Sequence, residues 1–207
     1  MNALRKIEDQ LTYVRIISAG YLFVILTGAF LLMIPAATVP GKRTDFLTAL
    51  FTATTSTCVT GLVTVTTATT WTVFGQAVIL ILVQIGGLGV ITVMSALMIL
   101  INHRMGLGQR LLVQDAFNLN TLSGLGRFVK KVMLGTFIIE SIGALLYMTV
   151  FVPEFGPRGI WISIFNSVSA FCNAGMDIIG ENSLMNYATN PIVNATSSAL
   201  IVLGGIG

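Results

Sequence analysis

Charged side chains are scarce in this sequence. Only 9% of its 207 residues are Asp, Glu, Lys or Arg, whereas about a quarter are charged in an average soluble domain. Three stretches contain none of these four residue types: residues 16–41, 46–102 and 182–207. Each is longer than the roughly 20 apolar residues that cross a bilayer as a helix. The composition therefore excludes a soluble enzyme, a nucleic-acid-binding protein and a disordered chain, and it predicts an integral membrane protein.

Cysteine and histidine are rare as well. Two cysteines cannot build a disulfide framework or a zinc site, and the single histidine has no second metal ligand near it. The sequence also has no nucleophile–base pair and no phosphate-binding loop, so neither an enzyme nor a bound cofactor is expected. A cleavable signal peptide is not expected either, because the apolar run after Arg15 is too long for one.

Four apolar segments are predicted to cross the membrane as helices. The first ends before Pro35, which cannot continue the hydrogen bonds of a helix interior. The second is longer than a hydrocarbon core of about 30 Å requires, so a bend is expected at its glycine cluster, Gly86–Gly89. The third contains one carboxylate, Glu140. The segments are residues 16–37, 71–101, 132–152 and 194–207.

The distribution of Lys and Arg predicts the orientation of the chain. Eight of the 11 basic residues lie either before the first segment or in the connection 102–131. Basic residues accumulate on the cytoplasmic side of membrane proteins. The N-terminus (1–15) and the connection 102–131 are therefore predicted to be cytoplasmic, and residues 38–70 and 153–193 to face outward. The prediction is a multi-pass protein of the cell (plasma or inner) membrane.

Residues 44–57, in the first outward connection, are too polar and too few to span a membrane. Apolar residues recur there at helical spacing from Phe46 to Phe51, and Thr44 followed by Asp45 suits a helix N-terminus. The segment is predicted to be a half-helix that enters the membrane and returns. Backbone that leaves helical form at that depth must be satisfied by protein or water, so we expect a re-entrant loop beside a water-lined path.

The sequence repeats itself at an offset of 114 residues. The alignment that places Cys58 on Cys172 also places Gly61 on Gly175. Downstream, Gly-Gly-Leu-Gly recurs as Gly-Gly-Ile-Gly at an offset of 118. Each unit is predicted to contain a helix, a half-helix, a short glycine-containing strand and a second helix. The predicted organisation is a cytoplasmic N-terminus (1–15), a first unit (16–101), a cytoplasmic connection (102–131) and a second unit whose last helix is cut short (132–207).

Gly61 and Gly175 follow the half-helices, of which the second is predicted at residues 161–171. Glycine reaches backbone conformations that turn consecutive carbonyl groups toward one axis. Such carbonyl groups can replace the hydration shell of a potassium ion, and the negative C-terminal ends of both half-helices would point at the cation. One glycine alone would fit a tight turn equally well, but two copies at matched positions favour ion-binding strips.

Three motifs stand out: Thr57-Cys-Val-Thr-Gly-Leu62, Gln84-Ile-Gly-Gly-Leu-Gly89 and Ser169-Ala-Phe-Cys-Asn-Ala-Gly175. Together they resemble the Trk/Ktr/HKT superfamily of potassium uptake proteins. A further segment, Met105-Gly-Leu-Gly-Gln-Arg-Leu-Leu-Val-Gln-Asp115, is most similar to the membrane subunit of bacterial Ktr systems. The resemblance extends over about residues 14–207.

The resemblance implies an all-α integral membrane fold of repeated helix–pore loop–helix units, as in potassium channels. About four spanning helices, two re-entrant half-helices and two filter strips are expected. Family members carry four units around one pore, so this sequence corresponds to the N-terminal half. The implied function is selective potassium uptake by the translocating subunit of a Trk/Ktr-type system. We expect the 207 residues alone not to conduct selectively, because they supply two of the four strips.

The resemblance also implies residue roles and partners. The two cysteines are expected to be small packing residues behind the filter. The implied partners are membrane lipid, a second full-length subunit and a cytoplasmic nucleotide-binding ring that would dock at the connection 102–131, without nucleic acid. The transported ion is K⁺. The backbone carbonyl groups that would coordinate it belong to Val59, Thr60, Gly61, Asn173, Ala174 and Gly175.

Three carboxylates are further candidates. Asp177 and Glu181 follow the second strip and either attract cations to the outer mouth or lie in a solvated loop. Glu140 either takes part in an ion path or gate, as carboxylates inside membranes often do, or forms a hydrogen bond to a Ser or Thr of a neighbouring helix. The hydrogen bond is slightly favoured, because Glu140 is predicted to lie in an outer helix away from the filter.

Two other functions remain open at the level of sequence. One is a structural or sensory membrane subunit whose pore loops do not conduct. The other is a potassium channel of tandem two-helix units, which would require a fuller filter such as Gly-Tyr-Gly. In this sequence Leu62 follows Gly61 and Met176 follows Gly175, so the second alternative fits less well.

Overall fold

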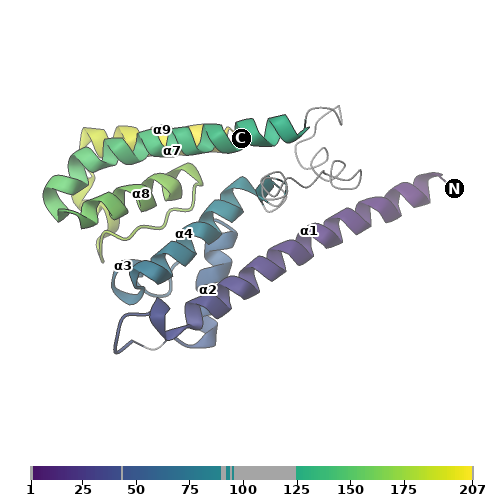
Figure 1. Ribbon diagram of the computed structural model, residues 1–207, viewed down its shortest axis with the longest axis horizontal. Helices are drawn as coiled ribbons and strands as arrows, with labels where there is room; N and C mark the ends of the chain where they lie inside the picture. The colour runs from purple at the N-terminus through teal and green to yellow at the C-terminus, as the bar shows by residue number, and fades with distance from the viewer. Residues whose placement is uncertain (1, 43, 90–91, 94, 96–124, 207) are drawn as a thin grey trace.

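A computed structural model describes residues 2–42, 44–89, 92–93, 95 and 125–206 (Figure 1). All regular elements in these ranges are helices, apart from one isolated antiparallel bridge between Thr38 and Trp71. The predicted connection 102–131 falls outside the described residues as far as position 124, and so does most of the second apolar segment beyond Gly89.

The order of the described helices is that of two similar units, each with a long helix, a half-helix and a second helix. Beyond the last helix of the first unit, Thr92, Val93 and Ser95 are helical as well. The elements are α1 (Asn2–Met33), η1 (Pro35–Ala37), α2 (Phe46–Thr57), α3 (Thr67–Thr70), α4 (Val73–Leu88), α7 (Leu125–Phe155), α8 (Arg158–Phe171), η2 (Ser183–Tyr187) and α9 (Pro191–Gly205).

Local chemistry explains where these helices begin and end. α1 ends at Met33, just before Pro35, as predicted. α2 begins after Asp45, whose Oδ1 accepts a hydrogen bond from the backbone N–H of Thr48 at 3.3 Å, so the predicted N-terminus is confirmed. α4 ends at Leu88 because Gly89 has a φ of 81°, which places the predicted break of the second segment at the last glycine of its cluster.

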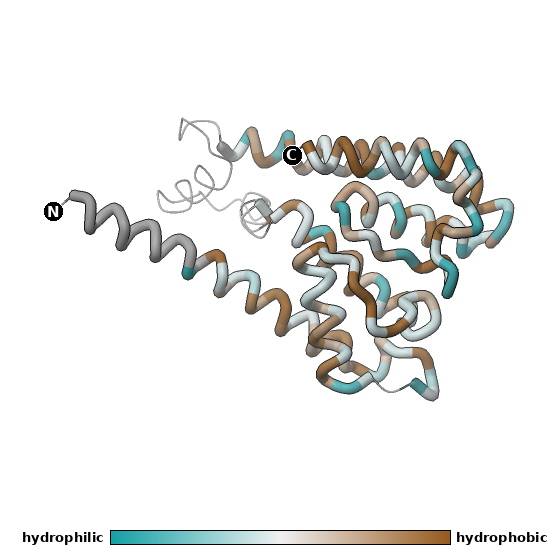
Figure 2. Tube along the Cα trace, turned by 180° about the vertical axis from the view of Figure 1, so that it is seen from behind, coloured by the Kyte–Doolittle hydropathy of each residue, from teal (hydrophilic) through white to brown (hydrophobic). Residues whose placement is uncertain are grey.

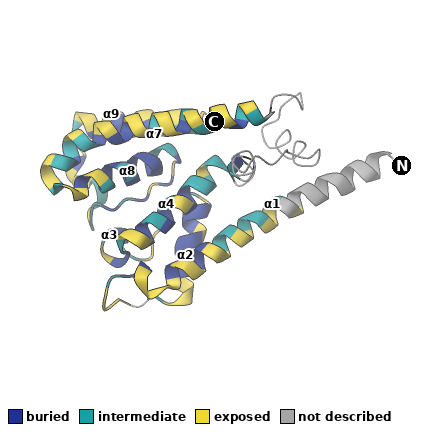
Figure 3. Ribbon diagram, viewed as in Figure 1, coloured by how far each residue is buried: buried dark blue, intermediate teal, exposed yellow. Residues whose placement is uncertain are grey.

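The helices form two groups that correspond to the two units (Figure 1). In the first group α1 packs on α2 and α4, and in the second α7 packs on α8 and α9. The groups meet where α4 contacts α8, so the second helix of one unit lies against the half-helix of the other. Each half-helix thus turns one face toward the interior of the molecule, and Figure 3 shows buried residues along α2 and α8.

The buried faces of the half-helices are rich in hydroxyl groups. Thr52 and Ser56 of α2 are 5% and 0% exposed, and Ser163 of α8 is 0% exposed. Each hydroxyl donates to the carbonyl oxygen four residues earlier, at 2.8, 2.6 and 2.7 Å respectively. These bonds satisfy the polar groups within the helix itself. Short polar helices can therefore occupy the interior of a membrane protein.

Apolar side chains cover the outer faces of the longer helices. Phe23 and Phe30 on α1 and Leu145 on α7 are 72%, 63% and 63% exposed, and Figure 2 shows hydrophobic residues recurring along α7 and α9. One helix in the described part, Gly126–Phe155, is long and apolar enough to cross a membrane, and shorter apolar helices occur at Ile17–Met33, Val73–Leu88 and Pro191–Gly205. These four helices overlap the four segments predicted to span.

Candidate ion-binding strips

Both half-helices end in a short segment without regular secondary structure. We call residues 59–61, after α2, the first strip and residues 173–175, after α8, the second strip. The sequence predicted a short strand at each place. Neither forms one in the described part of the chain, because the backbone of each strip alternates in handedness instead of staying extended.

The alternation is the same in both strips. Val59 and Gly61 have φ values of 55° and 74°, and their equivalents Asn173 and Gly175 have values of 57° and 67°. The residue between each pair has a negative φ. A left-handed φ is uncommon for an asparagine and rarer still for a β-branched valine, and such conformations persist only when their surroundings hold them. The surroundings are therefore part of the site.

Four backbone N–H groups tie each strip to its half-helix, and the four bonds match at the offset of 114 residues. In the first unit they donate to Thr54 O, Ser56 O, Thr55 O and Thr55 Oγ1, at 2.8, 3.3, 3.0 and 3.0 Å. In the second unit the acceptors are Val168 O, Ala170 O, Ser169 O and Ser169 Oγ, at 2.9, 3.1, 2.8 and 3.0 Å. The donors are Cys58, Val59, Thr60 and Leu62, and Cys172, Asn173, Ala174 and Met176.

These bonds determine where carbonyl groups point. In a trans peptide unit the N–H and C=O groups point in opposite directions, and the structure has no cis peptide bond in its described part. Because the N–H groups of residues 60 and 62 point back to α2, the carbonyl groups of Val59 and Gly61 point away from it. The carbonyl groups of Asn173 and Gly175 point away from α8 for the same reason.

The carbonyl oxygens of the strips are left without donors. Among the described residues, none donates a hydrogen bond to the carbonyl oxygen of any of the six strip residues. Nearly all buried backbone carbonyl groups in proteins are paired. The carbonyl groups of Val59, Gly61, Asn173 and Gly175, which point away from the half-helices, are therefore available to water or to a cation, whereas the carbonyl oxygen of Ala174 packs against Gly61.

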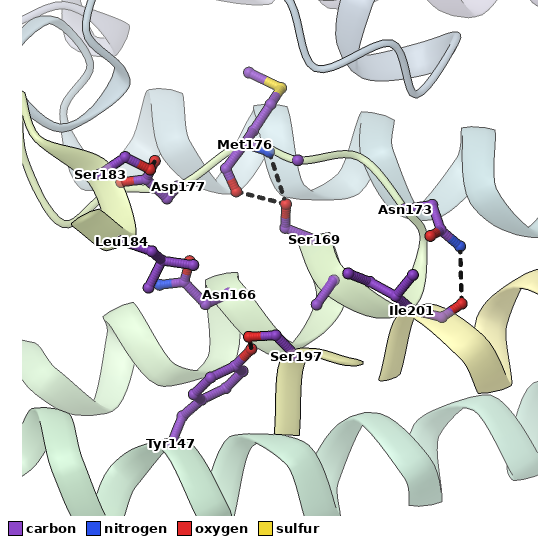
Figure 4. A pocket seen from close by; sticks show the side chains of 12 residues that line it. Tyr147, Asn166, Ser169, Asn173, Met176, Asp177, Ser183, Leu184, Ser197 and Ile201 are labelled. Atoms are coloured by element: carbon purple, nitrogen blue, oxygen red, sulfur yellow. Dashed lines mark hydrogen bonds between the residues drawn. The ribbon is translucent and has the colours of Figure 1, made fainter. Parts of the chain in front are cut away.

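Thr55 and Ser169, which align with each other in the repeat, hold the far ends of the strips, a role that the sequence did not predict. The Ser169 hydroxyl accepts from Met176 N–H and lies 2.5 Å from Met176 O (Figure 4). The Thr55 hydroxyl accepts from Leu62 N–H and lies 2.5 Å from the hydroxyl of Thr60. A hydroxyl residue three positions before each aligned cysteine was the available signal.

The two strips lie against each other. A Cβ atom at Gly61 would be 2.5 Å from the carbonyl oxygen of Ala174 and 3.7 Å from Gly175 Cα. Next to this contact, the hydroxyl of Ser56 lies 3.6 Å from the sulfur of Met176. The structure thus brings together the two segments that the sequence placed around one axis.

Glycines of the second helices support the ends of the half-helices. A side chain at Gly86 of α4 would collide with the carbonyl oxygen of Thr57, the last residue of α2. A side chain at Gly204 of α9 would collide with the carbonyl oxygen of Phe171, the last residue of α8. The glycine cluster that repeats at an offset of 118 residues therefore performs the same close packing in both units.

Glu140 lies in the middle of α7 and is 5% exposed. Its Oε1 accepts a hydrogen bond from Gln84 Nε2 of α4 at 2.9 Å. Its backbone carbonyl accepts a hydrogen bond from the hydroxyl of Ser167 of α8 at 2.6 Å. The side chain therefore bonds a glutamine of the other unit, not the Ser or Thr that the sequence suggested. A cavity of about 640 Å³ between α4, α7 and α8 borders both Gln84 and Glu140.

The other predicted site residues, Asp177 and Glu181, follow the second strip in the chain. Asp177 is half-buried, and its two carboxylate oxygens accept from Ile179 N–H at 2.9 Å and from the Ser183 hydroxyl at 2.5 Å. Glu181 is exposed. A small cavity of about 170 Å³ separates the second strip from Tyr147 and Ser197 (Figure 4). Asp177 thus stabilises its own loop and also borders this cavity.

The two cysteines are both free thiols in different surroundings. Cys172 is 8% exposed and packs against Gly87 of α4, where a Cβ atom would lie 2.5 Å from its sulfur. Cys58, at the equivalent position of the first unit, is exposed. The packing role expected for both cysteines thus agrees with the surroundings of Cys172, whereas no described segment covers Cys58.

Comparison with known proteins places the chain among transporters. It matches the family described as TrkH, cation transport protein, over residues 10–207. It is 39% identical to the potassium/sodium uptake protein NtpJ of Enterococcus hirae, over 98% of this chain and 45% of that protein. It is 41% identical to the Ktr system potassium uptake protein B of Bacillus subtilis, over 93% and 43%, and 32% identical to protein D of that system, over 98% and 45%.

These matches cover nearly all of this chain, and the chain spans less than half the length of each of these relatives. The family consists of transport proteins, which confirms that the chain is not an enzyme. Its membrane-helical fold agrees with the helical structure and the apolar outer faces described above. The chain belongs to the TrkH family of cation transport proteins.

Proposed function

We propose that this chain forms part of the pore of a transporter that takes up potassium ions selectively. The observation that carries the proposal is the pair of strips, which share one backbone geometry and leave their carbonyl oxygens without donors. Carbonyl oxygens at the right spacing replace the water molecules that surround K⁺ in solution. The ligands of the ion would be the backbone carbonyl groups of residues 59–61 and 173–175.

The electrostatics of the site favour a cation without any carboxylate at the strips. α2 and α8 both end immediately before their strips, and the C-terminal end of a helix carries roughly half a negative charge. Two such ends directed at one ion stabilise it at membrane depth, where an isolated charge is costly. Asp177 and Glu181 lie on the outer side of the second strip and would raise the local concentration of cations.

We further propose that α1, α4, α7 and α9 cross the membrane and that α2 and α8 are re-entrant. The apolar outer faces of the long helices and the internally satisfied hydroxyls of the half-helices support this arrangement. The excess of Lys and Arg before residue 16 and in the connection 102–131 supports a cytoplasmic N-terminus.

The assembly is proposed from the relatives. Two strips enclose an ion on two sides only, so two further units complete the pore. The relatives named as Ktr system proteins are components of a larger system, and we propose a dimer of the four-unit subunit that binds a cytoplasmic nucleotide-binding ring. The connection 102–131 is on the side where such a ring would dock.

The test is ion flux through the four-unit transporter in which this chain supplies two units, reconstituted in liposomes. We expect uptake of ⁸⁶Rb⁺ that an excess of K⁺ suppresses. The same concentration of Na⁺ should not suppress it. The controls are liposomes without protein and liposomes with heat-denatured protein. Absence of flux in every nucleotide state would indicate a non-conducting structural or sensory subunit, and equal suppression by Na⁺ would exclude potassium selectivity.

A further inference from the structure

Helix α4 carries two glutamines that reach across to the second unit. They are eight residues apart, which is about 12 Å along the helix. Gln76 is 5% exposed, and its Oε1 accepts a hydrogen bond from Trp161 Nε1 at 2.8 Å. Gln84 Nε2 donates to Glu140 at 2.9 Å, and Gln84 Oε1 lies 3.8 Å from the sulfur of Cys172, which donates to it.

The two glutamines contact opposite ends of α8. Trp161 lies in the first turn of α8, whereas Cys172 is its C-cap and directly precedes the second strip. Gln76 therefore holds the end of α8 that is far from the strip, and Gln84 holds the end from which the strip emerges. The pair offers a matched comparison within one helix.

The contact around Gln84 is linked to α7 and α8 by further contacts, although the cavity between α4, α7 and α8 borders it on one side. Gly87, one turn later on α4, packs against Cys172, and Ser167 of α8 donates to the carbonyl oxygen of Glu140 at 2.6 Å. Gln84 thus bonds α7 through Glu140 and α8 through Cys172, while Glu140 itself is bonded to α8. In a low-dielectric interior such linked hydrogen bonds strengthen one another.

This polar connection is not part of the repeat. At the offsets of the two units, Gln84 corresponds to Val202 and Glu140 corresponds to Leu26, both apolar. The backbone geometry of the strips is repeated, but the hydrogen-bonded support at Gln84 belongs to the boundary between the first and second units alone among the described residues. The two units therefore differ in how the end of the half-helix is supported by polar contacts.

We propose that Gln84 is a positioning residue that sets the ion selectivity of the second strip. The inference rests on the proposed function. By fixing Cys172, Gln84 fixes the residue before Asn173, where the left-handed backbone begins. A shift at that point moves the carbonyl oxygens of the strip relative to those of the first strip. Selectivity between two ions of different size depends on such positions, whereas folding depends on them much less.

The experiment compares Gln84→Met with Gln76→Met in the reconstituted four-unit transporter. Methionine keeps the length of the side chain and removes its hydrogen bonds. The first readout is the selectivity ratio, which is the factor by which K⁺ competes with ⁸⁶Rb⁺ uptake more strongly than Na⁺ does. The second readout is the midpoint of thermal unfolding. We expect Gln84→Met to lower the ratio about fivefold, as the loss of one net hydrogen bond predicts. Gln76→Met should lower the unfolding midpoint and leave the ratio unchanged.

Two further variants keep the test decisive if Gln84→Met folds poorly. Cys172→Ala removes the donor at the other end of the same contact and should lower the ratio in the same direction. The exchange Gln84→Glu with Glu140→Gln retains one amide and one carboxyl group, and it should restore the ratio. Recovery by this exchange distinguishes positioning from a loss of packing.

The outcomes separate this inference from the proposed function. A selective parent transporter whose ratio is unchanged by both Gln84→Met and Cys172→Ala would overturn the role of Gln84 and leave the pore intact. Equal losses in Gln84→Met and Gln76→Met would also overturn it, since support of α8 at either end would then suffice. A parent that conducts without selectivity contradicts the proposed function and the inference together.

Discussion

Gly61 of the first unit lies directly against the carbonyl oxygen of Ala174 in the second, at a distance that leaves no space for a Cβ atom. Each strip is therefore part of the wall that holds the other. The equivalent position in the second unit, Gly175, has open space where its Cβ atom would be. The two glycines share a left-handed φ but differ in their surroundings, and this difference can be tested.

Gly61→Ser should reduce selectivity more than Gly175→Ser. Both serines would adopt a left-handed φ, which costs a non-glycine residue roughly 1–2 kcal/mol. At Gly61 the new side chain also displaces Ala174 O, so both strips are distorted. We expect the preference for K⁺ over Na⁺ to fall sharply in Gly61→Ser and by a smaller factor in Gly175→Ser, as measured by ⁸⁶Rb⁺ flux at matched expression. Unchanged selectivity in Gly61→Ser would contradict the assignment of the strips.

Glu140→Gln should preserve transport. The amide oxygen can still accept from Gln84 Nε2, and the bond from Ser167 to the backbone is untouched. Glu140→Leu removes the acceptor and strands a buried amide donor, at a cost of about 1–3 kcal/mol. We expect near-normal flux for Glu140→Gln and a lower yield of folded protein for Glu140→Leu. If well-folded Glu140→Gln protein lost most of its flux, the carboxyl group would have to act in the ion path or gate.

Gly86→Ala should destabilise the protein by about 2 kcal/mol or more, since overpacking against a fixed carbonyl group forces backbone shifts. The obstacle is Thr57 O at the end of α2. Gly135→Ala on α7 is the control, because outside its own helix no atom of the described residues lies within 4 Å of its Cβ position, and the higher helix propensity of alanine should make it neutral or slightly stabilising. Thermal unfolding in detergent, followed by size-exclusion chromatography, measures both. Equal effects would contradict the proposed close packing of α4 on α2.

Tyr187→Phe should weaken the contact between η2 and the C-terminal end of α7. The Tyr187 hydroxyl donates to Glu154 Oε2 at 2.6 Å, and its ring packs edge-on against Phe151 at 5.1 Å. Burial of Tyr187, together with the hydrogen bond and the charge of Glu154, raises the pKa of its hydroxyl.

A raised pKa favours the neutral hydroxyl in the folded state, so the stabilisation is complete below the ordinary tyrosine pKa of about 10 and is lost as the pH rises above it. Unfolding midpoints of the wild type and Tyr187→Phe should therefore differ at pH 7–9 and converge at higher pH. A difference that grew above pH 10 would contradict this coupling.

Local rules were sufficient to predict several elements. Asp45 as the start of a half-helix, Pro35 as the end of the first long helix and Gly89 as a break each follow from the chemistry of one residue and its neighbours. The equivalence of the two strips followed from glycine spacing. These features depend on contacts within a few residues, so a single sequence contains the information for them.

The strips and their support depended on contacts that local patterns do not encode. Val59 adopts a left-handed conformation that a β-branched residue disfavours, and Asn173 adopts the same conformation, because hydrogen bonds to Thr55 and Ser169 hold the neighbouring peptide units. The partner of Glu140 is Gln84, 56 residues away in the chain. Which residue pairs with Glu140 depends on how far α4 and α7 are shifted along their axes relative to each other. Sequence periodicity alone does not determine that shift.

Val59 and Asn173 occupy equivalent backbone positions with unrelated side chains. The valine methyl group lies beside Gly86, whereas the Asn173 amide donates to Ile201 O at 3.3 Å. An ion would contact equivalent peptide groups of either unit. The side chains that support these peptide groups are apolar in the first unit and hydrogen-bonded in the second. Under the proposed function, the side chains at these two positions can therefore differ between the units while the backbone that would face the ion stays the same.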